Sequence, residues 1–579
     1  MEEFKTATRW KLDNLQCGFN LDKYNFYLGG MNDKLIELES YSETNILSES
    51  DLVIISQLIQ QIDSAESFYH CLLTEDVEPS YLSSLNETIS TLKKQVYSIL
   101  SNLQGNLHSM SEPLYVEWAK DVKQTDFLTE LLDYAKVEDK ISEPSTVGSL
   151  EAHYLQVRDS LRIKFDYLNE MKELTFGEAI DLAMSHPAQS YRTLIFQELN
   201  KTLEEQANSF ASIYNQMVGL RLHEAQIKKV NCLDESLILN GISKQTLDVV
   251  WETIDSNLHA LSKYFNVKSN KATNERLDWH EFMSPSPNDP AQLTFDQAVD
   301  AITKSLESID SNMSEFVKDA VANGWVDAEP RITKQSGGFC VPFISEGESR
   351  ISLNFDNKIN SARILAHEFG HAWHFKQMSV VPSLRFLEDT LEMTVAETSS
   401  IFFETVCIDY LIQNTSDISI KKSILGEKIE RSLTYLMSIK GAFSFEERFY
   451  ECRKSGLLDA EQIEELSLRC QNEAYGGNLR NYEPFVWIKY GQFYQANTPF
   501  YNYPYTIGFL LSLGLLDSAK KDQQFDRKFQ SFLSETRTVP LEQLMKKHFQ
   551  IDLSQRSFWQ QSLQKIIQDI ELFQELTVS

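Results

Sequence analysis

Long helical periodicity, with few residues that interrupt it, constrains the fold of this chain more than any other feature. Over residues 191–229 apolar side chains recur mostly three to five positions apart, and the run contains no proline. Segments 51–70 and 87–103 follow the same pattern. The 579 residues include only 21 glycines and 14 prolines, which disfavours an all-β fold, because such folds need many turns. The sequence therefore predicts a mainly α protein.

One helical segment carries a metal-binding pattern. Residues 362–375 have helical periodicity, and within them His367 and His371 stand four positions apart. Residues at this spacing share one face of a helix, so both imidazoles can reach one zinc ion. Glu368 follows the first histidine and lies beside the ion, where it can act on a bound water. Gly370, next to the second histidine, indicates close approach by a neighbouring helix or by substrate.

A catalytic zinc site also needs a third protein ligand, and the acidic residues downstream supply the candidates. Residues 387–404 are expected to form a second helix, and Glu397 lies near its middle among small side chains that let two helices pack closely. Spacing favours Glu397, with Glu392 as its rival. Glu404 falls seven residues later on the same face, placed to hydrogen-bond a liganding histidine. The remaining acidic candidates of this segment are Glu388 and Asp389.

Four separated segments of the chain form a recognisable set, at residues 10–15, 336–340, 367–404 and 499–508. The third contains His367-Glu-Phe-Gly-His371-Ala-Trp-His374, followed by Val395-Ala-Glu397-Thr-Ser-Ser400 and Glu404. The set resembles the thimet oligopeptidase/oligoendopeptidase F family of zinc metallopeptidases, and bacterial oligoendopeptidase F-like members in particular.

The resemblance implies a ligand set and an architecture. It makes His367, His371 and Glu397 the ligands of one zinc ion and Glu368 the catalytic carboxylate. It also implies two helical lobes that enclose a deep substrate channel, with the zinc-binding helix pair in the C-terminal lobe and a small β element before the motif helix. We expect an N-terminal helical lobe at residues 1–186 and a catalytic domain at residues 187–579.

One position departs from the family's pattern. Members often carry a histidine shortly before the tyrosine motif, and counting back in this chain reaches Gln492. Stabilisation of the oxyanion would then depend on zinc and on tyrosine hydroxyls, with Gln492 as a neutral donor. We expect Tyr501 and Tyr505 to be the functional pair, since phenols stay protonated at neutral pH, although ring packing is the alternative for each tyrosine. His374 is expected to contact the zinc surroundings or the substrate rather than the ion.

Together these residues predict a zinc metalloendopeptidase in which Glu368 is the general base for a zinc-activated water. Short unfolded oligopeptides are the expected substrates, because an enclosed channel rejects folded proteins. A strand such as residues 350–355 is expected to pair with the peptide backbone. Two alternatives stay open: a zinc carboxypeptidase on a related helical scaffold, and a catalytically impaired peptide-binding relative, which the missing histidine suggests.

Charge and composition restrict the partners and the compartment. A formal net charge of −30 repels phosphate backbones and predicts no nucleic-acid partner. The longest strongly apolar run, residues 507–516, is shorter than a bilayer span, and the first residues lack the apolar region of a secretory signal. We therefore expect no membrane partner. The 7 cysteines are scattered and form no C-x-x-C pair, which is typical of free thiols in a reducing compartment, so we expect a cytoplasmic enzyme.

Overall fold

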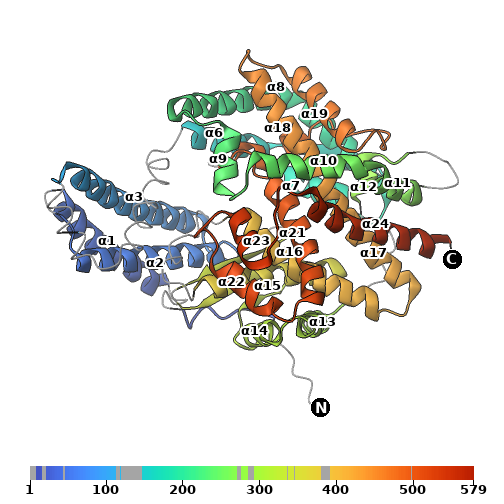
Figure 1. The fold of residues 1–579 in the computed structure, drawn as a ribbon. Helices are drawn as coiled ribbons and strands as arrows, with labels where there is room; N and C mark the ends of the chain where they lie inside the picture. The colour runs from blue at the N-terminus through green and yellow to red at the C-terminus, as the bar shows by residue number, and fades with distance from the viewer. Residues whose placement is uncertain are drawn as a thin grey trace.

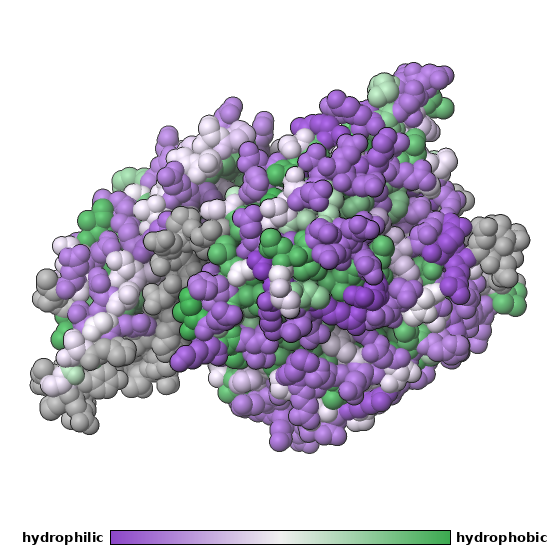
Figure 2. Space-filling view, turned by 90° about the horizontal axis from the view of Figure 1, so that it is seen from above, coloured by the Kyte–Doolittle hydropathy of each residue, from purple (hydrophilic) through white to green (hydrophobic). Residues whose placement is uncertain are grey.

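Helices make up most of the part of the chain that the computed structural model describes, which confirms the mainly α prediction. The described residues are 8–15, 21–43, 46–111, 118, 146–269, 276–284, 292–334, 337–344, 346–379, 392–496 and 498–578. Among them, no helix combines the length and the apolar character needed to cross a membrane. Polar side chains cover most of the face seen from above, with apolar ones in patches between them (Figure 2).

Three helices near the N-terminus form an arm at one side of the molecule (Figure 1). The second of them begins with a capping box: the Ser48 hydroxyl accepts from the Asp51 amide, and the Asp51 carboxylate accepts from the Ser48 amide. The helices expected over segments 51–70 and 87–103 are the second and third of the arm. The arm consists of α1 (Leu21–Ser42), α2 (Glu49–Leu72) and α3 (Pro79–Ser109).

The other helices pack into a larger body around a second hydrophobic core. The 40-residue α8 (Gln189–Lys228) matches the helix expected over residues 191–229. Its neighbours along the chain are α6 (Thr146–Ser160), α7 (Phe176–Ser185), α9 (Cys232–Leu239), α10 (Lys244–Leu261), α11 (Lys263–Lys268), α12 (Trp279–Met283), α13 (Phe295–Glu307) and α14 (Ser311–Ala322).

The C-terminal part of this body contains the metal-binding motif and the tyrosine motif. Its helices are α15 (Ile359–Met378), α16 (Met393–Asn414), α17 (Ile418–Leu433), α18 (Ile439–Arg453), α19 (Ala460–Ala474), α20 (Val486–Lys489), α21 (Tyr503–Lys521), α22 (Phe525–Ser534), α23 (Leu541–Phe549) and α24 (Arg556–Val578). A π-helical turn, η3 (Thr434–Ser438), joins α17 to α18, and a 3-10 turn, η4 (Gly491–Tyr494), follows α20.

The larger core draws on residues from both sides of position 186. Ala179 and Ile195, for example, are both fully buried in it. The lobe boundary near residue 186 and the enclosed channel stay predictions.

Two small sheets complete the fold. A hairpin pairs β1 (Arg162–Tyr167) with β2 (Glu170–Thr175), and its two turn residues, Leu168 and Asn169, have φ of 57° and 63°. Positive φ at both central positions is typical of the turn that matches the twist of a tight hairpin.

The second sheet has the strand order β3-β5-β4 and ends shortly before α15, so the chain has a small β element before the motif helix. The strand β5 (Glu348–Leu353) pairs in parallel with β3 (Val326–Asp327) and antiparallel with β4 (Gly338–Phe343). The expectation that residues 350–355 pair with a peptide is therefore wrong in its choice of strand, because β5 lies between two neighbours. The outer strands are β3, which is only two residues long, and β4, whose Val341 and Phe343 are buried in the core of the arm.

Candidate metal centre

The motif helix α15 packs closely on α16. A Cβ atom placed on Gly370 would lie 2.5 Å from Cα of Ser400 and 2.6 Å from the carbonyl oxygen of Ser399, so no larger residue fits there. The Ser399 hydroxyl donates to the Gly370 carbonyl at 2.8 Å. The neighbour expected beside Gly370 is thus a helix. The same closeness brings the middle of α16 within reach of the histidines.

A third helix, α21, packs on the other side of α16. A Cβ atom on Gly508 would meet the Cβ of Glu397 at 2.8 Å.

The helix α16 starts at Met393, with Glu392 as its N-cap, so the helix expected from residue 387 begins later than predicted. Glu388 and Asp389 lie outside the described residues.

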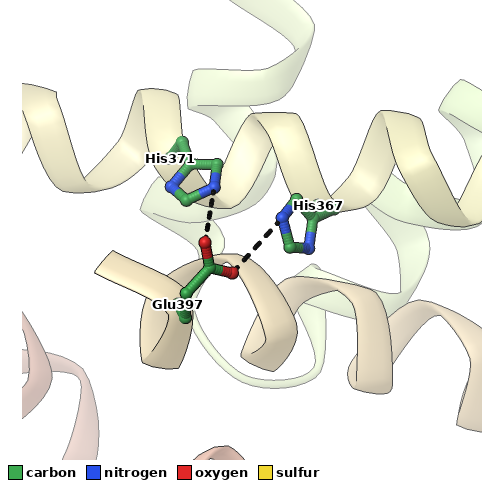
Figure 3. A group of neighbouring side chains, drawn as sticks. All are labelled: His367, His371 and Glu397. Carbon is green, nitrogen blue, oxygen red and sulfur yellow. Dashed lines mark ion pairs between the residues drawn. The ribbon is translucent and has the colours of Figure 1, made fainter. Parts of the chain in front are cut away.

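Three side chains converge between α15 and α16 (Figure 3). His367 Nε2 lies 3.5 Å from Oε2 of Glu397, and His371 Nε2 lies 3.9 Å from Oε1 of the same carboxylate. One donor atom from each of the three lies within 4.8 Å of the others. Two ligands of a tetrahedral zinc ion with bonds of about 2.1 Å lie roughly 3.4 Å apart, so this spacing suits the ion.

A carboxylate behind His367 fixes the orientation of its ring. Glu404 Oε2 lies 3.2 Å from His367 Nδ1, and Arg363 Nη1 donates to the same oxygen at 3.0 Å. A carboxylate can only accept, so Nδ1 carries a proton, which leaves Nε2, on the side of Glu397, as the nitrogen that could bind a metal. Burial alone would raise the pKa of Glu404, but Arg363, His367 and Arg431 hold it at about 2. The donor set and its supporting carboxylate fit a zinc ion.

The rival carboxylate, Glu392, lies elsewhere. It is buried at the start of α16, where one of its oxygens is 2.8 Å from a Cβ placed on Gly241. Burial raises the pKa of Glu392 to about 8, against a smaller lowering by Arg537. The group of potential ligands found among the described residues contains Glu397 and not Glu392.

Glu368 lies between this cluster and the start of β4. Only 5% of it is exposed, and burial raises its pKa to about 7. A Cβ atom on Gly338 would lie 3.0 Å from Glu368 Oε1 and 2.7 Å from Ile364, so glycine keeps the approach to the carboxylate open. Ser336, in the glycine-rich segment expected on the substrate side, lies outside the described residues.

The two expected tyrosines lie together at the start of α21. The hydroxyls of Tyr501 and Tyr505 are 3.0 Å apart. Burial raises the pKa of both phenols, and the Glu397 carboxylate raises them further. Both groups are therefore protonated donors at neutral pH, and both lie within electrostatic range of Glu397.

No hydrogen bond among the described residues joins the side chains of His374 and Gln492 to the three convergent side chains, although His374 lies within electrostatic range of His371. His374 is fully buried, its Nε2 is 2.8 Å from the Thr536 hydroxyl, and burial lowers its pKa to about 3. Gln492 is half-buried on η4, and none of the described hydrogen bonds joins its side chain to the cluster. The roles expected for these two residues stay predictions.

Sequence reasoning missed three residues of the site. Arg363 could have been found from the sequence, because it precedes His367 by four positions on the same helix face. No sequence pattern identifies Arg431 and Tyr435, since α17 and η3 reach the site only through the tertiary fold. Arg431 Nε donates to the Tyr435 hydroxyl at 3.0 Å, and its guanidinium lies 4.7 Å from the ring centroid. Burial alone would lower the pKa of Arg431, but Tyr435, Glu404 and Glu397 raise it.

Comparison with known proteins agrees with this geometry. The family model described as peptidase family M3 matches residues 182–565. The chain is 21% identical to oligopeptidase PepF of Bacillus subtilis, over 71% of this chain and 61% of that protein, so the match spans less than two thirds of the relative. An oligoendopeptidase F homolog of Borreliella burgdorferi is also 21% identical, over 90% of each chain. The fold is similar to the crystal structure of oligoendopeptidase-F from Enterococcus faecium, with a TM-score of 0.68, 14% identity, and coverage of 96% of this chain and 99% of that one.

Proposed function

Because the chain belongs to peptidase family M3, we propose that this metallopeptidase is a zinc endopeptidase that hydrolyses short unfolded oligopeptides. The observation that carries the proposal is the convergence of His367, His371 and Glu397 within 4.8 Å, with the buried carboxylate of Glu368 beside them. Two imidazoles and one carboxylate are a donor set typical of catalytic zinc sites.

In this proposal His367, His371 and Glu397 hold one zinc ion. Bound zinc supplies Lewis acidity that makes a water nucleophilic near neutral pH and polarises the scissile carbonyl. Glu368 takes a proton from the water and passes it to the leaving amine. Glu404 keeps the ring of His367 oriented through its contact with Nδ1, and Arg363 donates to the same Glu404 oxygen.

Neutral donors complete the proposed site. In this proposal Tyr501 and Tyr505 donate to the oxyanion that develops on the scissile carbonyl, and one such donor is worth roughly 3 kcal/mol. Both phenols lie within electrostatic range of Glu397. Gln492 stands where related peptidases often have a histidine, and we assign it a supporting role as a neutral donor.

The peptide is proposed to bind as an added strand along β4. This strand is the longer of the two outer strands of its sheet, and its first residue, Gly338, lies beside Glu368. Backbone pairing at a sheet edge makes side-chain preference broad, which suits a peptidase of mixed oligopeptides. The lobes at residues 1–186 and 187–579 would enclose the peptide, and the scattered cysteines support a cytoplasmic location.

Digestion of a random peptide library, followed by mass spectrometry with and without a zinc chelator, tests the proposal. We expect cleavage at internal bonds, also in peptides with blocked ends, and loss of cleavage with the chelator. Release of single C-terminal residues, lost when the C-terminus is blocked, would identify a carboxypeptidase instead. Zinc bound at one ion per chain without any cleavage would identify an impaired peptide-binding relative.

A further inference from the structure

A buried cluster of polar side chains lies behind the tyrosine motif and takes no part in the mechanism above. It is formed by Tyr214 and Arg221 of α8 and by Glu446 and Tyr450 of α18. Arg221 Nη1 donates to the Tyr450 hydroxyl at 2.8 Å, and all four residues are at most 5% exposed. Buried charged groups are costly unless they are paired, so the position of such a cluster calls for a reason.

The cluster binds the main chain on both sides of the segment that leads into Tyr501. Glu446 Oε1 accepts a hydrogen bond from the Phe500 amide at 2.9 Å. Arg221 donates to the Phe493 carbonyl at 3.3 Å and also to the Gln495 carbonyl. The same two charged side chains therefore hold η4, which carries Gln492, and the residue directly before Tyr501.

Phe500 has a backbone conformation that needs such support. Its φ of 59° is in the left-handed region, where a bulky aromatic residue is strained. Its ring packs against Tyr450 and Phe443, with centroids 5.1 Å and 5.7 Å away. Strain of this kind persists only where the surroundings hold it, and it is concentrated at functional sites. The next residue is Tyr501, whose hydroxyl meets that of Tyr505.

We propose that Glu446 is a positioning residue for the peptidase reaction: by holding the Phe500 amide it keeps the chain in the left-handed turn that directs Tyr501 toward Tyr505 and Glu397. This inference rests on the proposed function, because it assigns Tyr501 to the reaction. Arg221 supports the same segment from its other side. Neither side chain touches the reacting atoms.

Two substitutions of Glu446 separate this role from simple packing. Glu446→Gln keeps a carbonyl oxygen for the Phe500 amide, whereas Glu446→Leu removes it at a similar volume. We expect Glu446→Leu to lower kcat about 10- to 100-fold, which is at most the fall in kcat caused by removing one oxyanion donor. KM and zinc content should stay close to wild type. Glu446→Gln should stay within about 3-fold of wild type, since the acceptor remains. Glu447→Leu, on the exposed face of the same helix, is the matched control and should leave kcat unchanged.

Amide hydrogen exchange tests the support directly and does not depend on activity. Peptides covering residues 498–505 should exchange faster in Glu446→Leu than in wild type, and at the wild-type rate in Glu446→Gln. Unchanged exchange in Glu446→Leu would overturn the proposal, even if the protein cleaved no peptide and the proposed function had failed. Faster exchange with unchanged kcat would also overturn it, because loosening the segment would then have no effect on the reaction.

A double-mutant comparison assigns the effect to Tyr501. In a Tyr501→Phe background, Glu446→Leu should lower kcat by less than about 3-fold, because the hydroxyl that it positions is already gone. A full-sized effect in that background, or equal losses of kcat in the Gln and Leu variants, would contradict a role through Tyr501.

Discussion

The core of the N-terminal arm and the layer between α15 and α16 bury different kinds of side chains. The arm packs aliphatic and aromatic residues against one another, with Leu35, Ile55 and Phe68 fully buried. The α15–α16 layer buries the carboxylates of Glu397 and Glu404 to a similar extent. Apolar burial favours folding, whereas burial of a charge disfavours it unless a partner compensates. The difference shows that the α15–α16 layer, which contains the proposed metal ligands, buries groups that lower the stability of the fold.

The buried carboxylates on α15, on α16 and at the N-cap of α16 are not equivalent. Glu404 has cationic neighbours, which hold its pKa at about 2 despite burial. Burial dominates at Glu368 and Glu392 and raises their pKa to about 7 and about 8. The paired carboxylate is thus fixed as an anion, while Glu368 is close to the pKa that a general base needs at neutral pH. Each prediction below tests one of these differences, either between the carboxylates or between the two cores.

The largest effect is expected from loss of the third ligand. Glu397→Ala removes one of three donors and should weaken zinc binding by well over the 10- to 100-fold typical of losses behind the ligands. Glu392 is the N-cap residue of α16, five positions before Glu397, and Glu392→Ala should leave zinc affinity near wild type. Zinc content after dialysis against a graded chelator measures both. Equal zinc content in the two variants would remove Glu397 from the ligand set.

The next effect is expected in turnover alone. Glu368→Gln keeps the shape of the side chain but cannot take a proton, so kcat should fall by about 10²- to 10⁴-fold. Zinc content should stay at the wild-type level, because this carboxylate is not a ligand in the proposal. Cleavage of a fluorogenic peptide and metal analysis on the same sample provide the measurement. A variant that cleaves at nearly the wild-type rate would show that Glu368 is not the base.

A smaller effect is expected behind His367. Glu404→Gln leaves a neutral acceptor for Nδ1, and zinc affinity should fall by about 10- to 100-fold. Arg363→Leu should cause a smaller loss, because the Glu404–His367 contact survives it. Competition with a zinc-binding dye gives both dissociation constants. If Arg363→Leu weakened binding more than Glu404→Gln, the guanidinium would act on the ligands by a route other than Glu404.

Local patterns in the sequence predicted the parts of the fold and site that depend on neighbouring residues. The spacing of His367 and His371 fixes their shared face in any helix, and small residues around Glu397 let α16 approach Gly370. The same reasoning placed the start of the second helix too early, because nothing local marks Glu392 as its N-cap. The hairpin β1–β2 was missed although Ile163 and Phe165 alternate with polar residues, a pattern that helical segments on both sides obscured.

Contacts between distant segments could not be predicted. Arg431 and Tyr435 come within electrostatic range of Glu404 and Glu397 only because α17 folds back onto α16 and η3 packs on α21. The inner position of β5 depends on its pairing with β3, a two-residue strand with no pattern of its own. The support of Phe500 by Glu446 joins residues 54 positions apart. A single sequence contains no local sign of such pairs.

The last effect concerns stability and separates a buried carboxylate from the apolar core of the arm by pH. Glu392 has a folded pKa of about 8, above its unfolded value of about 4.3, so between these values the folded chain binds more protons than the unfolded one. Stability contributed by this site therefore falls as pH rises through that window, by at most about 1.4 kcal/mol per pH unit. Glu392→Gln removes the titration, so its free energy of unfolding relative to wild type should increase from pH 5 to pH 8. Leu35→Ala in the apolar arm should cost about 2–5 kcal/mol at both pH values, because no charge changes there. Urea unfolding at the two pH values compares them, and a constant difference for Glu392→Gln would show that this carboxylate is ionised in the folded protein.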